Sequence, residues 1–175
     1  MLKIITLPNP LLAAPTKPVV NFDRKLKKLV KEMIETLTAQ KDPLGVGLAA
    51  NQVGYPLSLF IIRPSEKEPI EVFINPKILK IDPLKTKPKV NKIKLEGCLS
   101  IPKIWGPVKR AQKILIEFQD INGQKKIKWY RGFKAVIIQH EIDHLQGVVF
   151  TQRVLEQKNP LYKEKNGQLK PVDFV

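Results

Sequence analysis

The spacing of apolar residues predicts one amphipathic helix near the start of the chain. Between residues 22 and 40, apolar side chains recur at steps of three and four residues, separated by lysines and glutamates. This spacing places them on one face of a helix, where they can pack against a core. Asn21 or Asp23 is in position to cap its first turn.

Short apolar runs further along the chain predict β-strands. Residues 57–62 have the composition of a buried strand, and residues 71–74 form a second run that ends at Asn75-Pro76. Residues 113–119 and 125–130 alternate around Asn122-Gly123, which is a strong hairpin signal.

Two polar segments carry weaker patterns. Residues 77–94 are rich in lysine, and their alternation predicts an edge strand followed by a solvated loop. Residues 148–150 favour a short strand. Residues 151–175 are predicted to be a polar tail with one short helix near Val154.

A second helix is predicted over residues 132–146, and it is apolar on nearly all sides. A helix with this pattern is usually buried, and Gly147 is its expected stop. Strands precede and surround this one helix. The pattern therefore favours an α+β fold, with antiparallel or mixed sheets around a central helix, and residues 1–175 as a single domain.

Composition limits the classes of protein that remain. The 175 residues are 43% hydrophobic, which suits one domain with a real core. The single cysteine cannot form an intramolecular disulfide and fits a reducing compartment. No apolar run reaches the length of a membrane span, and the proline-broken N-terminus is a poor secretory signal. We therefore expect a cytoplasmic protein without a membrane partner.

The charge is strongly basic, with 31 Lys and Arg against 16 Asp and Glu, for a net charge of +15. Such an excess indicates solubility and contact with polyanions, and it says nothing about the fold. A solvated basic surface is the simplest explanation.

The main candidate for chemistry lies on the buried helix. The only two histidines of the chain, His140 and His144, are four residues apart, and Glu141 directly follows the first. On a helix this spacing puts both imidazoles on one face, where they can bind one metal ion. An unpaired cluster of His, Glu and Asp would be costly in a buried helix, and a metal offsets that cost.

A catalytic metal usually has three protein ligands, so one ligand is missing from this pair. The candidates are a carboxylate or the thiol of Cys98. The carboxylates after His144 are Glu156, Glu164 and Asp173, in a stretch with little helical pattern. Cys98 follows a glycine, and its thiolate would suit zinc or ferrous iron.

Three segments of the chain occur in the order typical of a known family. They are Gly45-Val46-Gly47-Leu48-Ala49-Ala50-Asn51-Gln52, Glu96-Gly97-Cys98-Leu99-Ser100 and Gln139-His140-Glu141-Ile142-Asp143-His144-Leu145. Each alone is modest, but the three in this order are specific. Over about residues 1–155 the chain resembles the bacterial-type peptide deformylases.

The resemblance implies a fold, a reaction and a set of site residues. The fold would be mixed sheets around the metal helix. Cys98, His140 and His144 would bind one divalent metal, natively Fe²⁺ in most members, with Zn²⁺ or Ni²⁺ as alternatives. Gln52 and the backbone N–H of Leu99 would stabilise the oxyanion. Glu141 would be general base and acid while hydroxide from the metal attacks the formyl carbon of N-formylmethionine and formate is released.

The resemblance also implies where substrates and partners bind. Val136 and Ile137 would line a methionine side-chain pocket together with Leu44–Gly47, that is Leu44, Gly45, Val46 and Gly47. The substrates would be nascent N-formylmethionyl peptides. A transient ribosome contact through the basic surface is expected, and DNA is not an expected partner.

Two other classes of protein share part of this pattern. A zinc endopeptidase has the same helix motif but needs a carboxylate as third ligand. A basic RNA- or ribosome-binding protein with a structural metal fits the charge. Such a metal normally has four protein ligands, and an aromatic content of 7% is low for base stacking.

Overall fold

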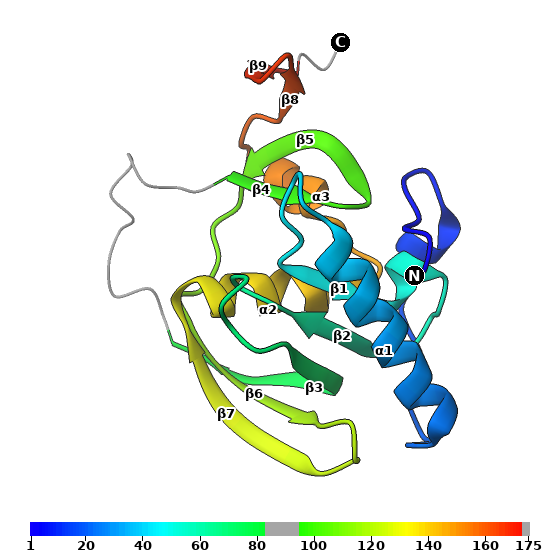
Figure 1. Cartoon of the computed structure of the whole chain (residues 1–175). Coiled ribbons are helices and arrows are strands. Elements are labelled where there is room, and N and C mark those ends of the chain that lie inside the picture. Colours follow the sequence, from blue (N-terminus) through cyan, green and yellow to red (C-terminus); the bar gives the residue numbers. More distant parts are fainter. Residues whose placement is uncertain (83–94, 173–175) are drawn as a thin grey trace.

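Two antiparallel sheets and one buried helix, α2 (Gly132–Leu145), form the body of the protein (Figure 1). The structure is a computed structural model, and it describes residues 1–82 and 95–172. The five-stranded sheet runs in the order β1 (Gly47–Ala49), β2 (Leu59–Ile62), β3 (Glu71–Ile81), β6 (Lys113–Gln119) and β7 (Lys125–Arg131). The four-stranded sheet runs in the order β4 (Leu95–Cys98), β5 (Ile101–Pro107), β8 (Tyr162–Lys165) and β9 (Gln168–Pro171). The predicted α+β class is confirmed.

The two faces of the five-stranded sheet pack against different helices. On the face toward α2, the ring of Phe73 stacks on Phe60 at 4.8 Å and contacts Phe118 at 4.5 Å between centroids. The predicted amphipathic helix, α1 (Arg24–Ala39), packs on the opposite face against β1 and β2. The sheet is thus buried on both sides over its first strands, which explains why all of β2 is buried.

The start of α1 shows how the sequence fixes a helix boundary. The Asp23 carboxylate oxygen Oδ1 accepts hydrogen bonds from the backbone N–H groups of Lys25 and Leu26, both at 2.9 Å. These are two of the donors that the first turn of a helix leaves without an internal partner. Asp23, one of the two predicted caps, is therefore the cap that forms.

The buried helix α2 ends where the sequence predicted. Gly147 has a φ of +74°, a conformation that favours glycine. A Cβ at this position would lie 2.7 Å from the carbonyl carbon of Ala13, so the N-terminal segment passes directly over the helix end. Two short 3-10 turns, η1 (Pro10–Leu12) and η2 (Ala50–Val53), contact each other nearby.

The prediction that the second strand stops at Asn75-Pro76 was wrong. β3 continues to Ile81 and pairs with β6, with register shifts that absorb the irregular residues. Asn75 has a φ of 49°, and its backbone N–H still donates to the carbonyl of Ser58 at 2.8 Å. Its side-chain amide exchanges two hydrogen bonds with the backbone of Val19, each 2.8 Å. Most of the predicted loop in residues 77–94 lies outside the described residues.

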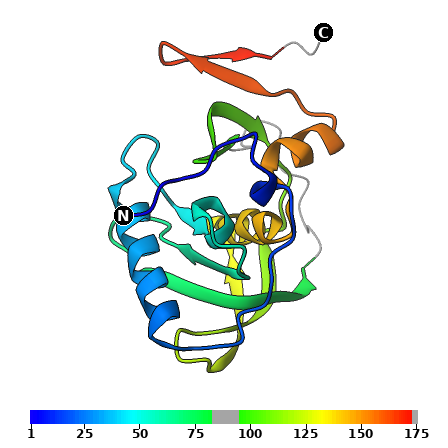
Figure 2. The same ribbon diagram turned by 90° about the vertical axis from the view of Figure 1, so that its right-hand side faces the viewer.

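The C-terminal region differs most from expectation. Residues 148–150 do not form a strand, because Phe150 begins α3 (Phe150–Glu156) and its side chain is buried. The predicted short helix near Val154 is therefore present. β8 and β9 form an unpredicted hairpin around Asn166-Gly167, and both turn residues have positive φ. Figure 2 shows this hairpin at one end of the molecule, beyond α3.

Within the described residues, none of the helices combines the length and the apolar character that crossing a bilayer requires.

The capping bonds of Asp23 give a first testable prediction. Asp23→Ala removes the oxygen that accepts both hydrogen bonds and should lower the free energy of unfolding by about 0.5–2 kcal/mol. Chemical denaturation followed by circular dichroism measures this change. Asp23→Asn, which keeps a capping oxygen, is the matched control, and an equal loss in both variants would contradict the capping argument.

Candidate metal centre

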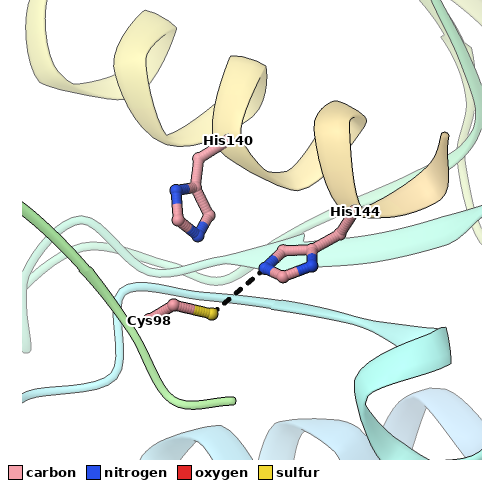
Figure 3. A group of neighbouring side chains, drawn as sticks. All are labelled: Cys98, His140 and His144. Carbon is pink, nitrogen blue, oxygen red and sulfur yellow. Dashed lines mark hydrogen bonds between the residues drawn. The ribbon is translucent and has the colours of Figure 1, made fainter. Parts of the chain in front are cut away.

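Helix α2 brings three polar side chains to one place in an apolar setting. His140 and His144 lie one turn apart, with ring centroids separated by 5.0 Å. Glu141 and His144 are almost fully buried, at 3% and 1% exposure. The predicted spacing of the two imidazoles on one helix face is confirmed (Figure 3).

Cys98 reaches the histidines from the end of β4. The strand pair β4–β5 changes register between Gly97 and Cys98, so the chain turns sharply there and Cys98 pairs with Ile101. The Cys98 sulfur lies 3.2 Å from His144 Nε2 (Figure 3). Ligand atoms of Cys98, His140 and His144 all lie within 4.8 Å of one another.

The carboxylates considered as alternative third ligands have other partners. Glu164 Oε2 accepts a hydrogen bond from the Trp105 indole N–H, and Glu156 pairs with Arg153. Asp173 lies outside the described residues. The structure thus brings Cys98, and neither Glu156 nor Glu164, to the two histidines.

The electrostatics of this cluster fit a divalent cation. Burial raises the pKa of the Cys98 thiol, but the adjacent imidazoles outweigh it and lower that pKa to about 5. A thiolate is the form of cysteine that binds metals. One sulfur and two imidazole nitrogens are a donor set for Zn²⁺ or Fe²⁺. The residues therefore fit a resident metal ion.

A chain of buried ion pairs holds His140 in place. Glu96 Oε2 accepts from His140 Nδ1 at 2.9 Å, which leaves the other ring nitrogen for the cluster. Arg110 binds both Glu96 oxygens at 2.9 and 3.0 Å and reaches Asp143 Oδ2 at 2.6 Å. Arg153, from α3, is the last member of this network and donates a hydrogen bond to Asp143 Oδ1 at 2.8 Å.

This network keeps Glu96 ionised. Burial raises the pKa of Glu96, but hydrogen bonds from His140 and Arg110 outweigh it and bring that pKa to about 2. An anionic acceptor on the outer nitrogen of a ligating histidine fixes the ring and increases its basicity. Sequence reasoning missed the ion pairs of Arg110 and Arg153, because nothing in the sequence links either arginine to Asp143 on the predicted buried helix.

Glu141 occupies a pocket made by a glycine. Burial raises the pKa of Glu141 to about 7 despite the nearby histidines. A Cβ on Gly47 would overlap the Glu141 carboxylate and lie 3.0 Å from Ile137. In the described part of the chain, Glu141 Oε2 is buried and has no hydrogen-bond partner. The absence of a side chain at Gly47 therefore makes room for the Glu141 carboxylate.

Gln52 is fixed beside the cluster by hydrogen bonds at both ends of its amide. Oε1 accepts from the backbone N–H of Ala49 at 2.9 Å, and Nε2 donates to Ser100 Oγ at 3.0 Å. Nε2 also lies 3.4 Å from the Cys98 sulfur. The amide is therefore held with its donor group toward the candidate metal ligands.

A pocket opens next to Cys98 on the side of β4 and β5. Its lining includes Cys98, Leu99 and Trp105 together with Gln40 and Pro43 from the loop after α1. The indole of Trp105 packs flat over Gly97, where a Cβ would lie 2.6 Å from the ring. The glycine thus lets the indole form a wall beside the candidate metal centre.

The other residues expected at the substrate lie on α2 and in the segment that leads into β1. Ile137 is 3% exposed and belongs to the core, and Val46 packs against the same cluster. Leu44 is 39% exposed, whereas Gly45 packs against Leu37 of α1. Val136 is partly exposed on α2.

The buried donor set of one thiolate and two imidazoles, with a carboxyl group alongside, defines a metal-dependent hydrolase built on an α+β fold. The family model of the polypeptide deformylases matches residues 1–160. The chain belongs to this family, whose members remove the formyl group from N-formylmethionine.

Individual relatives agree with this assignment. The chain is 40% identical over 169 residues to a peptide deformylase of Desulfotalea psychrophila, and the match covers 94% of each chain. Its structure resembles that of the peptide deformylase of Thermotoga maritima, with a TM-score of 0.77 and 36% identity over 88% of this chain and 97% of the other. A Plasmodium falciparum peptide deformylase gives a TM-score of 0.79 at 34% identity, over 89% of each chain.

The contact between Glu96 and His140 gives a second prediction. Glu96→Gln keeps the size of the side chain but removes the charge that orients the imidazole, so affinity for the metal should fall by roughly 10- to 100-fold. Competition with a chromophoric chelator measures this change. Glu156→Gln is the control: it removes the charge from an exposed ion pair with Arg153 and should bind metal normally. Unchanged affinity in Glu96→Gln would remove Glu96 from the support of the site.

The space at Gly47 gives a third prediction. In Gly47→Ala the new methyl group must displace the Glu141 carboxylate, so kcat/KM for a formyl-peptide should fall by about 100-fold or more. Metal content should stay normal, because Gly47 does not contact the three candidate ligands. Gly167→Ala in the distant β8–β9 turn serves as a control for general effects of a glycine substitution on activity. Full activity of Gly47→Ala would contradict the steric argument.

Proposed function

We propose that this protein hydrolyses the formamide bond of N-formylmethionine at the start of nascent polypeptides and releases formate. One observation carries the proposal: Cys98, His140 and His144 converge from two distant segments, with the buried carboxyl group of Glu141 on the same helix. Membership in the deformylase family agrees with this reaction.

Cys98, His140 and His144 would hold the metal ion, through one sulfur and two nitrogens. When bound, the cation supplies Lewis-acid chemistry, since it makes a water molecule more acidic and polarises a carbonyl group. The proposed native ion is Fe²⁺, with Zn²⁺ or Ni²⁺ as substitutes. The soft thiolate beside two imidazoles supports this choice over Mg²⁺ or Ca²⁺, which prefer oxygen ligands.

Glu141 is the proposed general base and acid. Its carboxylate takes a proton from the attacking water, which adds to the formyl carbon, and then gives that proton to the departing amine nitrogen as the C–N bond breaks. The products are formate and a free N-terminus. A buried carboxyl group whose pKa is raised to about 7 can both accept and donate a proton near neutral pH.

Gln52 and the backbone N–H of Leu99 are the proposed donors to the oxyanion. The bonds from Gln52 to Ala49 and Ser100 fix its amide before substrate arrives. Donors fixed in advance need no reorganisation during the reaction, and losing one typically costs about 100- to 1000-fold in rate.

The methionine side chain would lie among Val136, Ile137 and the segment Leu44–Gly47. The contact between Gly47 and both Ile137 and Glu141 supports this assignment, because it brings an apolar wall next to the proposed base. The residues that follow the methionine would extend along the pocket beside Leu99 and Trp105.

We place the reaction in the cytoplasm, where nascent chains emerge from the ribosome. A transient contact with the ribosome through the basic surface would bring the enzyme to its substrate. The net charge of +15 supports such a contact, since ribosomal RNA is a polyanion.

Formate release from a formyl-Met peptide, measured together with metal content, tests the proposal. Glu141→Ala should lower turnover by at least about 100-fold while keeping the metal, whereas Cys98→Ala should lose most of the bound metal. Asp120→Ala, in the distant loop between β6 and β7, is a control for both measurements. Normal turnover by Glu141→Ala, or hydrolysis of casein without hydrolysis of formyl-peptide, would overturn the proposal.

A further inference from the structure

One part of the five-stranded sheet lies beyond the reach of helix α1. The face that α1 covers over β1 and β2 continues across Ile74, Gln119 and Lys125, which pair directly from strand to strand. β6 and β7 lie at the far edge of the sheet from α1 (Figure 1). We call the side chains that β7, β6 and the end of β3 present on this side the β6–β7 face.

Two large apolar side chains occupy the middle of the β6–β7 face. Ile127 is 57% exposed and Trp129 is 41% exposed, in an edge strand where only Tyr130 is buried. They alternate with residues whose side chains point to the other side of the sheet, so both lie on the same surface. An exposed tryptophan and isoleucine side by side are unusual on a surface with no partner.

Cations surround this apolar pair. They are Lys77, Lys80, Lys113, Lys125 and Arg131, all placed on this side by their strand pairing. Lys113 pairs with Asp82, and Lys125 pairs with Glu117. Within the described residues, the other three form no ion pair. The face therefore carries positive charge that the protein does not neutralise.

The arrangement fits a short stretch of single-stranded RNA. Lys125 and Arg131 lie at the two ends of β7, about 20 Å apart at the usual rise of a strand. The ammonium of Lys113 lies over the Trp129 ring, 4.3 Å from its centre, so a base that takes its place on the ring would have a cation directly beside it. A nucleotide needs this pair, a cation for its phosphate and a flat apolar surface for its base.

We propose that the β6–β7 face binds single-stranded RNA, with phosphates at the cations and a base against Trp129. The opposite side of the same strands packs through Ile114, Ile116 and Tyr130 into the core around α2. The RNA site is thus separated from the candidate metal centre by the sheet, and it does not depend on the proposed hydrolysis. An anionic membrane is less suited, because a membrane-binding surface presents a large apolar face, whereas Ile127 and Trp129 form a small one among cations.

Charge reversal with a matched control tests the electrostatic part. The double variant Lys80→Glu/Arg131→Glu and the control Lys163→Glu/Lys165→Glu, on β8, each lower the net charge from +15 to +11. Affinity for a fluorescent 12-nucleotide single-stranded RNA of mixed sequence is measured by anisotropy. We expect a loss of about tenfold or more in the first variant, less than about threefold in the control, and a shallower salt dependence in the first variant alone.

Two tryptophan variants test the stacking part. Trp129→Ala should weaken RNA binding by about fivefold or more, whereas Trp129→Phe, which keeps an aromatic ring, should retain most of the affinity. In a Trp105→Phe background, Trp129 is the one remaining tryptophan, and its fluorescence should be quenched by the RNA. Thermal unfolding verifies that each variant is folded. If the Lys80→Glu/Arg131→Glu protein is unfolded, Lys77→Glu/Arg131→Glu takes its place.

Three results would overturn the proposal. The first is an equal loss of RNA affinity in the double variant and its control, which would indicate attraction by net charge alone. The second is unchanged affinity in Trp129→Ala together with unquenched Trp129 fluorescence. The third is binding to vesicles of phosphatidylglycerol that the β7 variants abolish while RNA binding is unaffected.

Discussion

The candidate metal centre depends on the placement of charge inside an apolar core. Arg110 is 9% exposed and lies between two buried carboxylates, Glu96 and Asp143, so each charge has a partner of opposite sign. Breaking one member of such a buried group typically costs about 3–5 kcal/mol, because the remaining charge is left unpaired in a medium of low polarity. Arg110 therefore connects the segment before β6 with strand β4 and helix α2, and Glu96 in turn positions His140. A flexible surface pair could not hold an imidazole with this constancy.

The elements that the sequence predicted well are those with a strong local signal. Helix α1 has its spacing and its cap at Asp23, and the β6–β7 hairpin has alternation on both sides of Asn122-Gly123. The errors arose where local signals were overruled. Asn75-Pro76 looks like the end of a strand, but β3 continues beyond it through a register shift, and the Asn75 side chain ties the strand to Val19. The β8–β9 hairpin also has its turn signal, Asn166-Gly167, but its flanking strands are too polar to be recognised by alternation, because they are exposed.

Residue types and their spacing in the sequence were enough to predict part of the candidate site. The two histidines and Glu141 share one helix. Ligand chemistry left a carboxylate or Cys98 as the third ligand, and the resemblance to a family selected Cys98. The supporting ion pairs were not predictable: Asp143 lies on a helix that was predicted to be buried, but nothing near Arg110 in the sequence identifies it as the partner of that carboxylate. Gly47 was expected only in the methionine pocket that the resemblance implies, and its contact with Glu141 joins residues more than ninety positions apart in the chain. Contacts of this kind are properties of the folded chain.

The hydrogen bond from the Trp105 indole to Glu164 connects a wall of the pocket with a strand 59 positions later in the sequence. None of the three candidate metal ligands lies in β8 or β9, so the C-terminal hairpin anchors a wall of the pocket without taking part in metal binding. Changes in the sequence of this hairpin can therefore alter the shape of the pocket while leaving the metal ligands untouched.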